Sequence, residues 1–415
     1  MNQFKYKGSD LYVENVKIIE IIKRHGTPCF IYSKSSITEQ FTSYKKSFKE
    51  HPHLICYAVK ANSNLSILNH LVRLGSGFDI VSGGELKRVL AAGGDPKKVV
   101  FSGIGKSEAE ISLALDMGIY CFNVESLDEL DRIQKICGQK KVIANISLRV
   151  NPDVDAETHP YISTGLKENK FGIAWTDVIH TYKKASQLQN LSVIGIDCHI
   201  GSQITSTFPF IDSVKKILGL ADDLEKLGIP IRHFDFGGGL GIRYEKEAPP
   251  SPKDWVRGLL SEVGMRKIKV ILEPGRSIVG SSGVLVTKIE YLKKGETKNF
   301  LIVDAAMNDL LRPALYNSHH DIISIDKKGR STETEYDVVG PICETADFLG
   351  KKRKLDVKNG DYLAILDAGA YAMSMSSNYN SRVRPPEIMV DNEVISLIKP
   401  REKLEELFQD EIIPW

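Results

Sequence analysis

Eight short apolar runs, separated by longer amphipathic segments, constrain the fold of this chain more than any other feature of its sequence. The runs are rich in β-branched residues and are typical of strands buried on both faces. They comprise residues 54–59, 78–81, 99–103, 119–124, 142–150, 193–200, 231–236 and 269–273. Strands that alternate with helices pair in parallel through right-handed crossovers. Eight such units over about 220 residues predict a (β/α)8 barrel, because that fold needs eight strand–helix units in one domain of about this size.

Local signals in the segments between the runs indicate helices. In the segment 64–74, Asn64 is a predicted N-cap and Gly75 a predicted helix end. A short polar side chain satisfies free backbone N–H groups at a helix start, and glycine adopts the left-handed turn that ends a helix. Two further starts have the spacing of a capping box, in which a serine and a glutamate each bond the other's backbone N–H. These are Ser107 with Glu110 and Ser126 with Glu129.

A doubly wound parallel sheet is the alternative to a barrel. It requires a glycine fingerprint after an early strand, followed by an acid about 20 residues further on. The glycine cluster GGGLG lies at 237–241, after the seventh predicted strand, and Ile242 breaks a Gly-x-Gly-x-x-Gly frame. The sequence therefore favours the barrel and does not support a dinucleotide site.

After residue 280 the pattern changes to strands separated by short polar turns such as KKGE and DKKGR. This pattern predicts an all-β, barrel-like second domain, with a helix only at the C-terminal EKLEEL. The N-terminal residues, which include LYVENVKI, are expected to add a strand to it. The predicted organisation is an α/β class chain, with a (β/α)8 TIM barrel over 30–278 and a β domain formed by 1–29 and 279–415.

Composition argues against several classes of function. The 415 residues are 42% hydrophobic and 26% charged, with a net charge of +2, so no global field favours nucleic acid or an anionic membrane. The N-terminal MNQFKYKGSD lacks the apolar core of a signal peptide, and no apolar run is long enough to span a membrane. The six cysteines form no Cys-x-x-Cys pair, which fits reduced thiols in the cytoplasm better than disulfides or a zinc site.

Polar residues follow the predicted strands at the carboxyl edge, where the active sites of such barrels lie. The sequence YAVKAN places Lys60 directly after the first strand; an edge lysine that reaches water is the simpler alternative. The other residues at this edge are Ser82, Glu125, His199, Ser202, Gly237, Gly238, Gly239 and the segment Glu273–Arg276. A lysine, a histidine, acids, an arginine and a glycine-rich loop are therefore expected to converge on one mouth.

These residue types together indicate pyridoxal 5'-phosphate. Barrels often bind phosphate with the loops after strands seven and eight, and glycines let backbone N–H groups approach an anion, although a tight turn also explains such a loop. The cofactor needs a lysine for its imine, a phosphate cup and a partner for its pyridine nitrogen. Glu273 is the predicted partner, because a carboxylate keeps that nitrogen protonated. His199 is predicted to stack on the ring, with a core histidine as the alternative. No metal is expected.

The motifs YAVKAN, HIGSQ (199–203), GGGLG and EPGR, in this order, resemble the barrel-type pyridoxal-phosphate decarboxylases, the fold type III group of alanine racemase and eukaryotic ornithine decarboxylases. The resemblance covers nearly the whole chain and includes the β domain. Within the group it is strongest to the diaminopimelate decarboxylases. These lyases convert meso-2,6-diaminopimelate to L-lysine and CO₂ in the last step of lysine biosynthesis. The resemblance also implies a homodimer with shared active sites.

The resemblance implies roles for individual residues. The catalytic residues would be Lys60, His199 and Cys343. The cofactor-binding residues would be Lys60, His199, Ser202, Gly238, Gly239, Glu273, Gly275, Arg276 and Tyr371. The substrate-binding residues would be Arg276, Arg312, Tyr316, Glu344 and Tyr371. Cys343, in GPICETAD (340–347), would donate a proton in the neighbouring subunit's site, with a buried structural cysteine as the alternative. The stretch 158–172 resembles the family's mobile lid.

Charge gives an argument about the substrate. Ornithine and lysine end in a bare ammonium and need an acidic pocket, whereas diaminopimelate ends in a whole amino-acid group and needs both signs. Arg276, Arg312 and Tyr316 with Glu344 supply both, and arginine holds a carboxylate bidentately. A surface or interface ion pair is the alternative for Arg312. A decarboxylase of arginine, ornithine or carboxynorspermidine remains an alternative function. A non-catalytic binding protein of the same fold is a further alternative, against which Lys60 and Cys343 argue.

Overall fold

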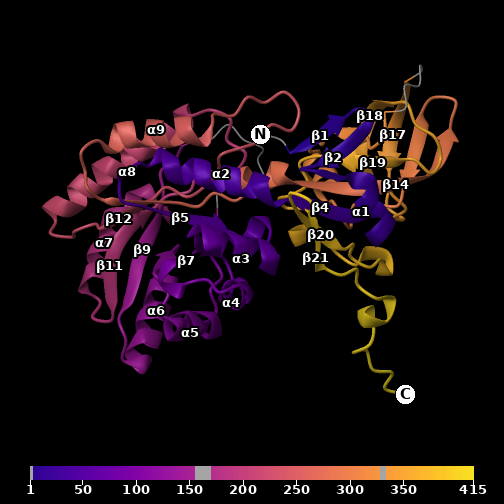
Figure 1. Ribbon diagram of the computed structural model, residues 1–415. Helices are drawn as coiled ribbons and strands as arrows, with labels where there is room; N and C mark the ends of the chain where they lie inside the picture. The colour runs from indigo at the N-terminus through magenta and orange to yellow at the C-terminus, as the bar shows by residue number, and fades with distance from the viewer. Residues whose placement is uncertain (1–2, 155–169, 328–332) are drawn as a thin grey trace. The chain divides into compact units, whose positions relative to one another are not determined.

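The computed structural model describes residues 3–154, 170–327 and 333–415, and the chain divides into two compact units (Figure 1). The barrel unit comprises residues 40–242 and 248–277, and the sheet unit comprises 1–39, 243–247 and 278–415. The sheet unit thus reaches residue 39 rather than 29. It also takes five residues from the loop after the seventh predicted strand.

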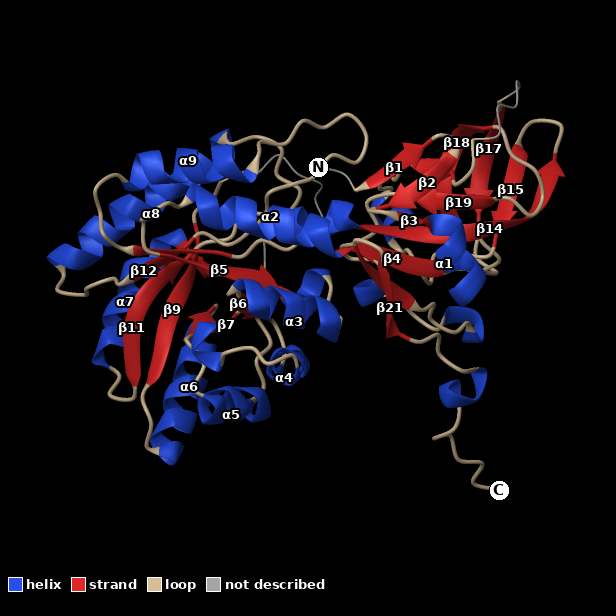
Figure 2. Ribbon diagram, in the orientation of Figure 1, coloured by secondary structure: helices blue, strands red, loops and turns tan. Residues whose placement is uncertain are grey.

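The barrel unit contains a closed ring of eight parallel strands. Figure 2 colours the strands red and the helices blue. The strands are β5 (His53–Ala58), β6 (Gly77–Ile80), β7 (Val99–Phe101), β8 (Cys121–Val124), β9 (Ala144–Asn151), β11 (Leu191–Asp197), β12 (His233–Asp235) and β13 (Lys269–Leu272). They pair in chain order, and the pairs β8–β9 and β13–β5 complete the ring. The two-residue β10 (Ile173–Ala174) adds to β9 from outside the ring. The predicted (β/α)8 barrel is confirmed.

Helices alternate with these strands. They are α3 (Leu65–Leu74), α4 (Gly83–Ala91), α5 (Glu108–Met117), α6 (Leu127–Lys140), α7 (Val178–Gln187), α8 (Phe208–Lys226) and α9 (Pro252–Val263), and α2 (Lys34–Ser47) precedes the barrel. The Asn64 side chain caps α3 by accepting from the N–H of Ser66, and Gly75 ends the helix in the left-handed region. Ser107 and Glu110 form a reciprocal capping box at α5. These local predictions are confirmed.

The second predicted capping box, at the start of α6, is only half formed. Ser126 accepts from the N–H of Glu129 as expected. The Glu129 carboxylate, however, bonds the buried ammonium of Lys106 at 2.7 Å and the N–H of Glu125 at 3.0 Å. A buried cation needs a charged partner more than a helix end needs its second cap bond. Tertiary charge pairing therefore overrides the local motif here.

The sheet unit contains two sheets. The first has the antiparallel strands β1 (Phe4–Lys7), β2 (Asp10–Val13) and β3 (Val16–Lys17). The second comprises β4 (Cys29–Ser33), β14 (Gly283–Lys294), β15 (Asn299–Val303), β16 (Ile322–Ser324), β17 (Thr334–Val339), β18 (Phe348–Leu355), β19 (Tyr362–Ile365), β20 (Glu387–Asp391) and β21 (Val394–Lys399). Apolar residues of both sheets form one core, in which Leu11 and Val13 lie with Val284 and Val286.

Three details of the sheet unit differ from the prediction. The unit contains helix α1 (Ile18–His25) and the short α11 (Arg312–Tyr316), so it is mostly rather than wholly β. The segment EKLEEL forms a single 3₁₀ turn, Leu404–Leu407, with no buried residue, because it has no apolar face packed on the sheet. The segment LYVENVKI forms β2, β3 and the start of α1. None of the described helices is long and apolar enough to cross a membrane.

Candidate active site

Lys60 lies in a 3₁₀ turn, Val59–Ala61, that directly follows β5. Its Nζ is 2.6 Å from Oδ2 of Asp79, a fully buried residue of β6. The second oxygen of Asp79 has no hydrogen-bond partner among the described residues. An edge lysine would extend into water, whereas this one is drawn inward to a buried acid. The Lys60 side chain is 37% exposed and so reaches solvent, but its ammonium is paired with a buried acid rather than with water alone.

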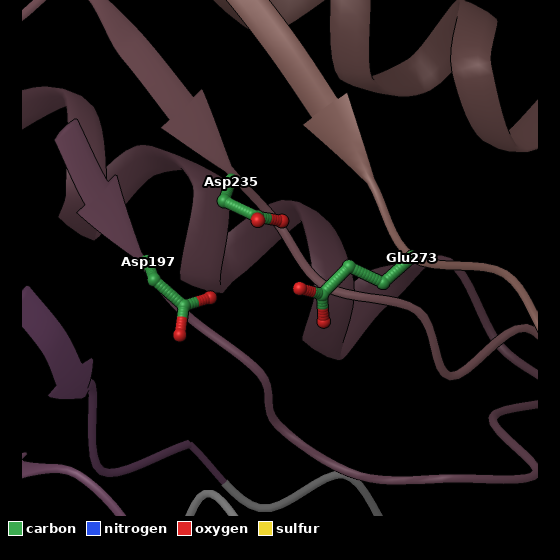
Figure 3. A group of neighbouring side chains, drawn as sticks. All are labelled: Asp197, Asp235 and Glu273. Atoms are coloured by element: carbon green, nitrogen blue, oxygen red, sulfur yellow. The ribbon is translucent and has the colours of Figure 1, made fainter. Parts of the chain in front are cut away.

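Three further acids lie at the carboxyl ends of neighbouring strands (Figure 3). Asp197 ends β11, Asp235 ends β12 and Glu273 follows β13, and their side chains project toward a common space. All three are buried, and one carboxylate oxygen of each lies within 4.8 Å of the others. Burial, reinforced by the neighbouring acids, raises the pKa of Glu273 and of Asp197. Burial also raises the pKa of Asp235 to about 6.

The surroundings of this acid cluster favour shared protons over a metal ion. Oδ1 of Asp235 accepts from the N–H of Gly237 at 3.0 Å, and Ser102 and Asn123 lie 3.5 Å from Oε1 of Glu273. Like charges this close in a buried place are relieved when a proton is retained between them. We assign no metal here. A cluster that keeps a proton next to Glu273 suits a partner for a basic ring nitrogen.

His199 and the glycine-rich loop contact each other. The N–H of Gly238 donates to Nδ1 of His199 at 3.1 Å, so the ring proton of a neutral His199 is on Nε2. Burial of the ring and the nearby cations Arg149 and Lys60 lower the pKa of His199 well below its ordinary value. His199 is therefore a flat, uncharged ring at the barrel mouth, as a stacking residue requires.

Close approach explains why this loop contains glycines. A Cβ on Gly238 would lie 2.2 Å from the carbonyl oxygen of Glu273. Gly239 has a φ of +99°, a region that side chains rarely adopt, and a Cβ there would lie 2.5 Å from the carbonyl oxygen of Gly201. The loop is thus a tight turn, as the alternative interpretation requires, and it is held directly against the segment that carries Glu273.

The segment after β13 brings the predicted anion ligands together. Arg276 is buried, and its Nη2 donates to Oγ of Ser202 at 2.9 Å. Gly275, also buried, packs against Ala61, the neighbour of Lys60. Serine, arginine and loop N–H groups are the donors that a phosphate requires. The barrel unit therefore unites all its predicted cofactor residues, and their chemistry fits pyridoxal phosphate.

Two of the polar residues predicted at the strand ends make contacts that stabilise the fold rather than contacts with the predicted cofactor residues. Ser82 is the N-cap of α4 and accepts from the N–H of Glu85. Glu125 is 2.8 Å from Nη1 of Arg149 and accepts from the N–H of Gly103 at 2.9 Å. Most of the predicted lid, 158–172, lies outside the described residues. Gly172, at its end, donates its N–H to Glu125 at 3.1 Å.

Arg312 begins α11 in the sheet unit and is 5% exposed. Its Nη1 is 2.8 Å from Nε2 of His320, and its guanidinium carbon lies 4.3 Å from the centre of the Tyr244 ring. This burial argues against the surface ion pair that was the alternative. Tyr316 ends the same helix and is partly buried. Tyr371 is partly buried and has a φ of +55°, which is uncommon for a residue with a side chain.

Cys343 is exposed, whereas the other five cysteines are buried, and all six are free thiols. Its N–H donates to Oδ1 of Asn380 at 2.9 Å. Asp347 fixes the same loop by accepting from the N–H groups of Met307 and Ile342 at 2.7 and 2.8 Å. A buried structural cysteine, the alternative for this residue, does not fit. The neighbouring Glu344 accepts from the Tyr379 hydroxyl at 3.4 Å.

The sequence analysis missed residues that contact or neighbour the predicted ones in each unit. These are Asp79, Asp197, Asp235 and Arg149 in the barrel unit and His320 in the sheet unit. The three aspartates lie within apolar strands, in FDIV, IDCHI and HFDF. Acids are rarely buried without a partner, so that placement was a usable signal. His320 and Arg149 carried no signal, because only the folded chain brings their partners to them.

The barrel, its lysine, the acid cluster and the glycine loop define a class, the barrel-type pyridoxal-phosphate enzymes. In agreement, residues 34–280 match the family model described as pyridoxal-dependent decarboxylase, pyridoxal binding domain. The chain is 53% identical over 411 residues, 99% of both chains, to a diaminopimelate decarboxylase of Pseudomonas aeruginosa. The chain therefore belongs to the diaminopimelate decarboxylase family, and pyridoxal 5'-phosphate is its cofactor.

Solved structures agree with this assignment. A diaminopimelate decarboxylase of Helicobacter pylori complexed with L-lysine is 44% identical, with a TM-score of 0.91 over 94% of this chain and 98% of that one. One from M. jannaschii in co-complex with L-lysine is 36% identical, with a TM-score of 0.95 over 100% and 98%.

Proposed function

We propose that this chain decarboxylates meso-2,6-diaminopimelate to L-lysine and CO₂. The observation that carries the proposal is the identity with a diaminopimelate decarboxylase over 99% of both chains. The arrangement in the barrel supports it, since the described residues provide a lysine, a neutral histidine ring and a proton-retaining acid cluster in one mouth. Two relatives of known structure were solved with the proposed product, L-lysine.

Pyridoxal phosphate supplies the electron sink on which an amino acid loses its α-carboxylate. The chain's residues would orient the cofactor and set the charge on its ring. Lys60 would hold the cofactor covalently, and Ser202 and Arg276 with Gly238 and Gly239 would hold its phosphate. Glu273 would keep a proton at the ring nitrogen, aided by the acids around it. The neutral His199 ring would pack on the cofactor without adding a charge.

Residues of the sheet unit would recognise the substrate and complete the reaction. Arg312 would hold the carboxylate that is retained in the product, because a planar guanidinium pairs with a carboxylate through two hydrogen bonds. Glu344 would hold the ammonium group beside it, with Tyr316 and Tyr371 as further polar ligands. Cys343 Sγ would deliver the proton that replaces the lost carboxylate. Its exposed thiol supports that role.

We further propose a homodimer in which Cys343 and Glu344 act in the partner's site. The motif GPICETAD and the exposure of both residues support the proposal. In a two-fold dimer each chain would give the same residues to the other, so two equivalent sites would form.

Borohydride trapping and product analysis together test the proposed function. The protein reconstituted with pyridoxal phosphate should retain the cofactor on Lys60 after borohydride reduction, as read by peptide mass spectrometry, and Lys60→Ala should lose the label. With meso-diaminopimelate the product should be L-lysine with one equivalent of CO₂. A label on another lysine would overturn the cofactor role of Lys60, and the absence of lysine would overturn the substrate.

A further inference from the structure

The guanidinium of Arg312 is held by a buried histidine, His320, which no predicted role includes. His320 is fully buried, and its two ring nitrogens have partners on opposite sides. Nε2 is 2.8 Å from Nη1 of Arg312, and Nδ1 is 2.8 Å from the carbonyl oxygen of Leu366. The ring is therefore fixed between the helix that carries Arg312 and the segment that follows β19.

These contacts determine the protonation state of His320. A guanidinium is only a donor and a carbonyl oxygen is only an acceptor. Nε2 must therefore accept from Arg312, and Nδ1 must carry the proton that is donated to Leu366. Each ring nitrogen then makes one hydrogen bond, and His320 is neutral. A doubly protonated ring would turn an N–H toward the guanidinium and break the contact.

Tyr244 completes the support of the guanidinium. Its ring lies 4.3 Å below the guanidinium carbon of Arg312 and packs edge-on against His320, with centroids 5.2 Å apart and planes at 70°. Tyr244 thus fixes the face of the guanidinium, and His320 fixes one of its edges. A carboxylate partner would cancel the positive charge of Arg312. Tyr244 and His320 are neutral, so they orient the guanidinium without cancelling its charge.

Three charged groups lie around this assembly: Arg353, Asp367 and Asp321. Nη2 of Arg353 donates to the carbonyl oxygen of His320 at 3.0 Å. Asp367 lies near Arg312, and burial raises its pKa to about 6 while its hydrogen bond to Ser281 opposes that rise. Asp321, the next residue along the chain, is bonded to His319 at 2.9 Å.

We propose that His320 is a positioning residue that sets the orientation of Arg312 for a substrate carboxylate. The inference rests on the proposed function, in which Arg312 holds the carboxylate that remains in the product. His320 would then govern recognition of that carboxylate without touching the substrate. Loss of its acceptor would let the guanidinium rotate, and a carboxylate would meet it with poorer geometry.

Two substitutions at position 320 separate the ring's two hydrogen bonds, the one that it accepts from Arg312 and the one that it donates to Leu366. The side-chain oxygen of glutamine can reach the place of Nε2, so His320→Gln keeps an acceptor for Arg312. The amide nitrogen of asparagine can reach the place of Nδ1, so His320→Asn keeps a donor to Leu366 but loses the acceptor. His319→Asn is the matched control, because that neighbouring ring contacts Arg353 and Asp321 rather than Arg312.

Steady-state kinetics on meso-diaminopimelate with the cofactor-loaded enzyme provide the first readout. His320→Asn should raise KM about 10- to 100-fold, the loss typical of a poorly paired charged contact, with kcat changed less than about threefold. His320→Gln and His319→Asn should keep KM within about threefold. Equal KM values for the asparagine and glutamine variants at position 320 would overturn the proposal.

Product inhibition provides a second readout that a loss of stability would not mimic. L-Lysine keeps one carboxylate, whereas cadaverine is the same chain without it. His320→Asn should weaken inhibition by lysine about 10- to 100-fold and leave inhibition by cadaverine unchanged. Weakening of both inhibitors to the same extent would overturn the proposal. If the unsubstituted enzyme makes no lysine, the proposed function fails instead, and that result is separate from the comparison of variants.

Discussion

Buried acids at the ends of the barrel strands give the barrel mouth its charge. Asp79, Asp197, Asp235 and Glu273 are all buried there. Nearby cations that offset them include Lys60, which pairs with Asp79, and Arg149, whose charge opposes the rise in the pKa of Asp197 that burial causes. A buried carboxylate without full compensation keeps its proton instead of its charge. The site is therefore suited to hold a protonated ring nitrogen, which adds the positive charge that the acids favour.

Asp235→Asn tests this charge balance. The pKa of Asp235 is about 6 in the folded chain and about 3.9 in the unfolded chain. Near pH 5 the folded chain therefore binds more protons than the unfolded chain does. Stability then falls as pH rises through the folded pKa. Asparagine keeps an oxygen for the N–H of Gly237 but removes the charge. The free energy of unfolding is measured with urea on cofactor-free protein at pH 5 and at pH 8. Between these two pH values it should fall by roughly 1–2 kcal/mol more in the unsubstituted chain than in the variant. The same pH dependence in both would contradict the raised pKa.

Arg312→Lys tests the carboxylate clamp. Lysine keeps the charge but loses the planar fork and the contacts of the guanidinium with His320 and Tyr244. We expect a loss of roughly 2–4 kcal/mol in transition-state binding, about 30- to 1000-fold in kcat/KM for meso-diaminopimelate. Arg257→Lys, in an exposed pair with Asp254 on α9, is the matched control and should change little. A change of less than threefold in Arg312→Lys would refute the clamp.

At the scale of elements, the loop that carries Lys106 and helix α6 form one buried polar unit. Nζ of Lys106 bonds Glu129 at 2.7 Å and the carbonyl oxygens of Gly103 and Asn123 at 2.6 and 2.8 Å. All three donors of the ammonium are therefore used. Such a pair tolerates burial only while both partners are present.

Lys106→Ala should accordingly destabilise the barrel by about 3–5 kcal/mol, because Glu129 would be left buried and unpaired. Lys140→Ala removes a surface ion pair with Asp116 and should cost less than about 1 kcal/mol. Urea midpoints at pH 7 measure both changes. Similar losses in the two variants would show that the buried pair does not contribute as described.

The barrel strands could be predicted from the sequence, whereas several elements of the sheet unit, such as helix α1, were not predicted. The eight barrel strands are buried on both faces, so each is a compact apolar run. Strand β18 lies at the end of its sheet and reads FLGKKRKL, so it forms no clear apolar run; its charged side chains protect an exposed edge. The Ser126–Glu129 motif predicted a helix start correctly and a reciprocal box incorrectly, because Lys106 competes for the carboxylate.

The candidate site, like the fold, could be predicted only in part from the sequence. The rule that active-site residues follow barrel strands found Lys60, His199 and Glu273, and the family resemblance supplied the residues of the sheet unit. The rule considers only residues after each strand, so it missed the acids within them. His320 and Asp347 depend on partners that only the folded chain brings near, such as Arg312 and Met307.

At the scale of the whole molecule, the proposed chemistry is divided between two units. The barrel unit holds the predicted cofactor residues apart from Tyr371, and the sheet unit holds Arg312, Cys343 and Glu344. If the sites are shared across a two-fold dimer, a chain defective in one set can be completed by a chain defective in the other.

Mixing Lys60→Ala with Cys343→Ala tests that arrangement. Each variant alone should be inactive. After random exchange from equal amounts about half of the dimers are mixed, and each mixed dimer has one intact site. Roughly a quarter of unsubstituted activity should therefore return. No recovery despite verified exchange would place both residues in one chain's site, or would remove Cys343 from the chemistry.

Substrate competition in a single tube tests the central claim most directly. The enzyme, loaded with pyridoxal phosphate, is given equal concentrations of meso-diaminopimelate, ornithine, arginine and carboxynorspermidine, and all amine products are quantified by mass spectrometry. The ratio of initial rates equals the ratio of kcat/KM values. We predict that L-lysine from diaminopimelate dominates the products, because only that substrate presents a distal carboxylate and ammonium together. Faster formation of putrescine, agmatine or norspermidine would contradict the assignment.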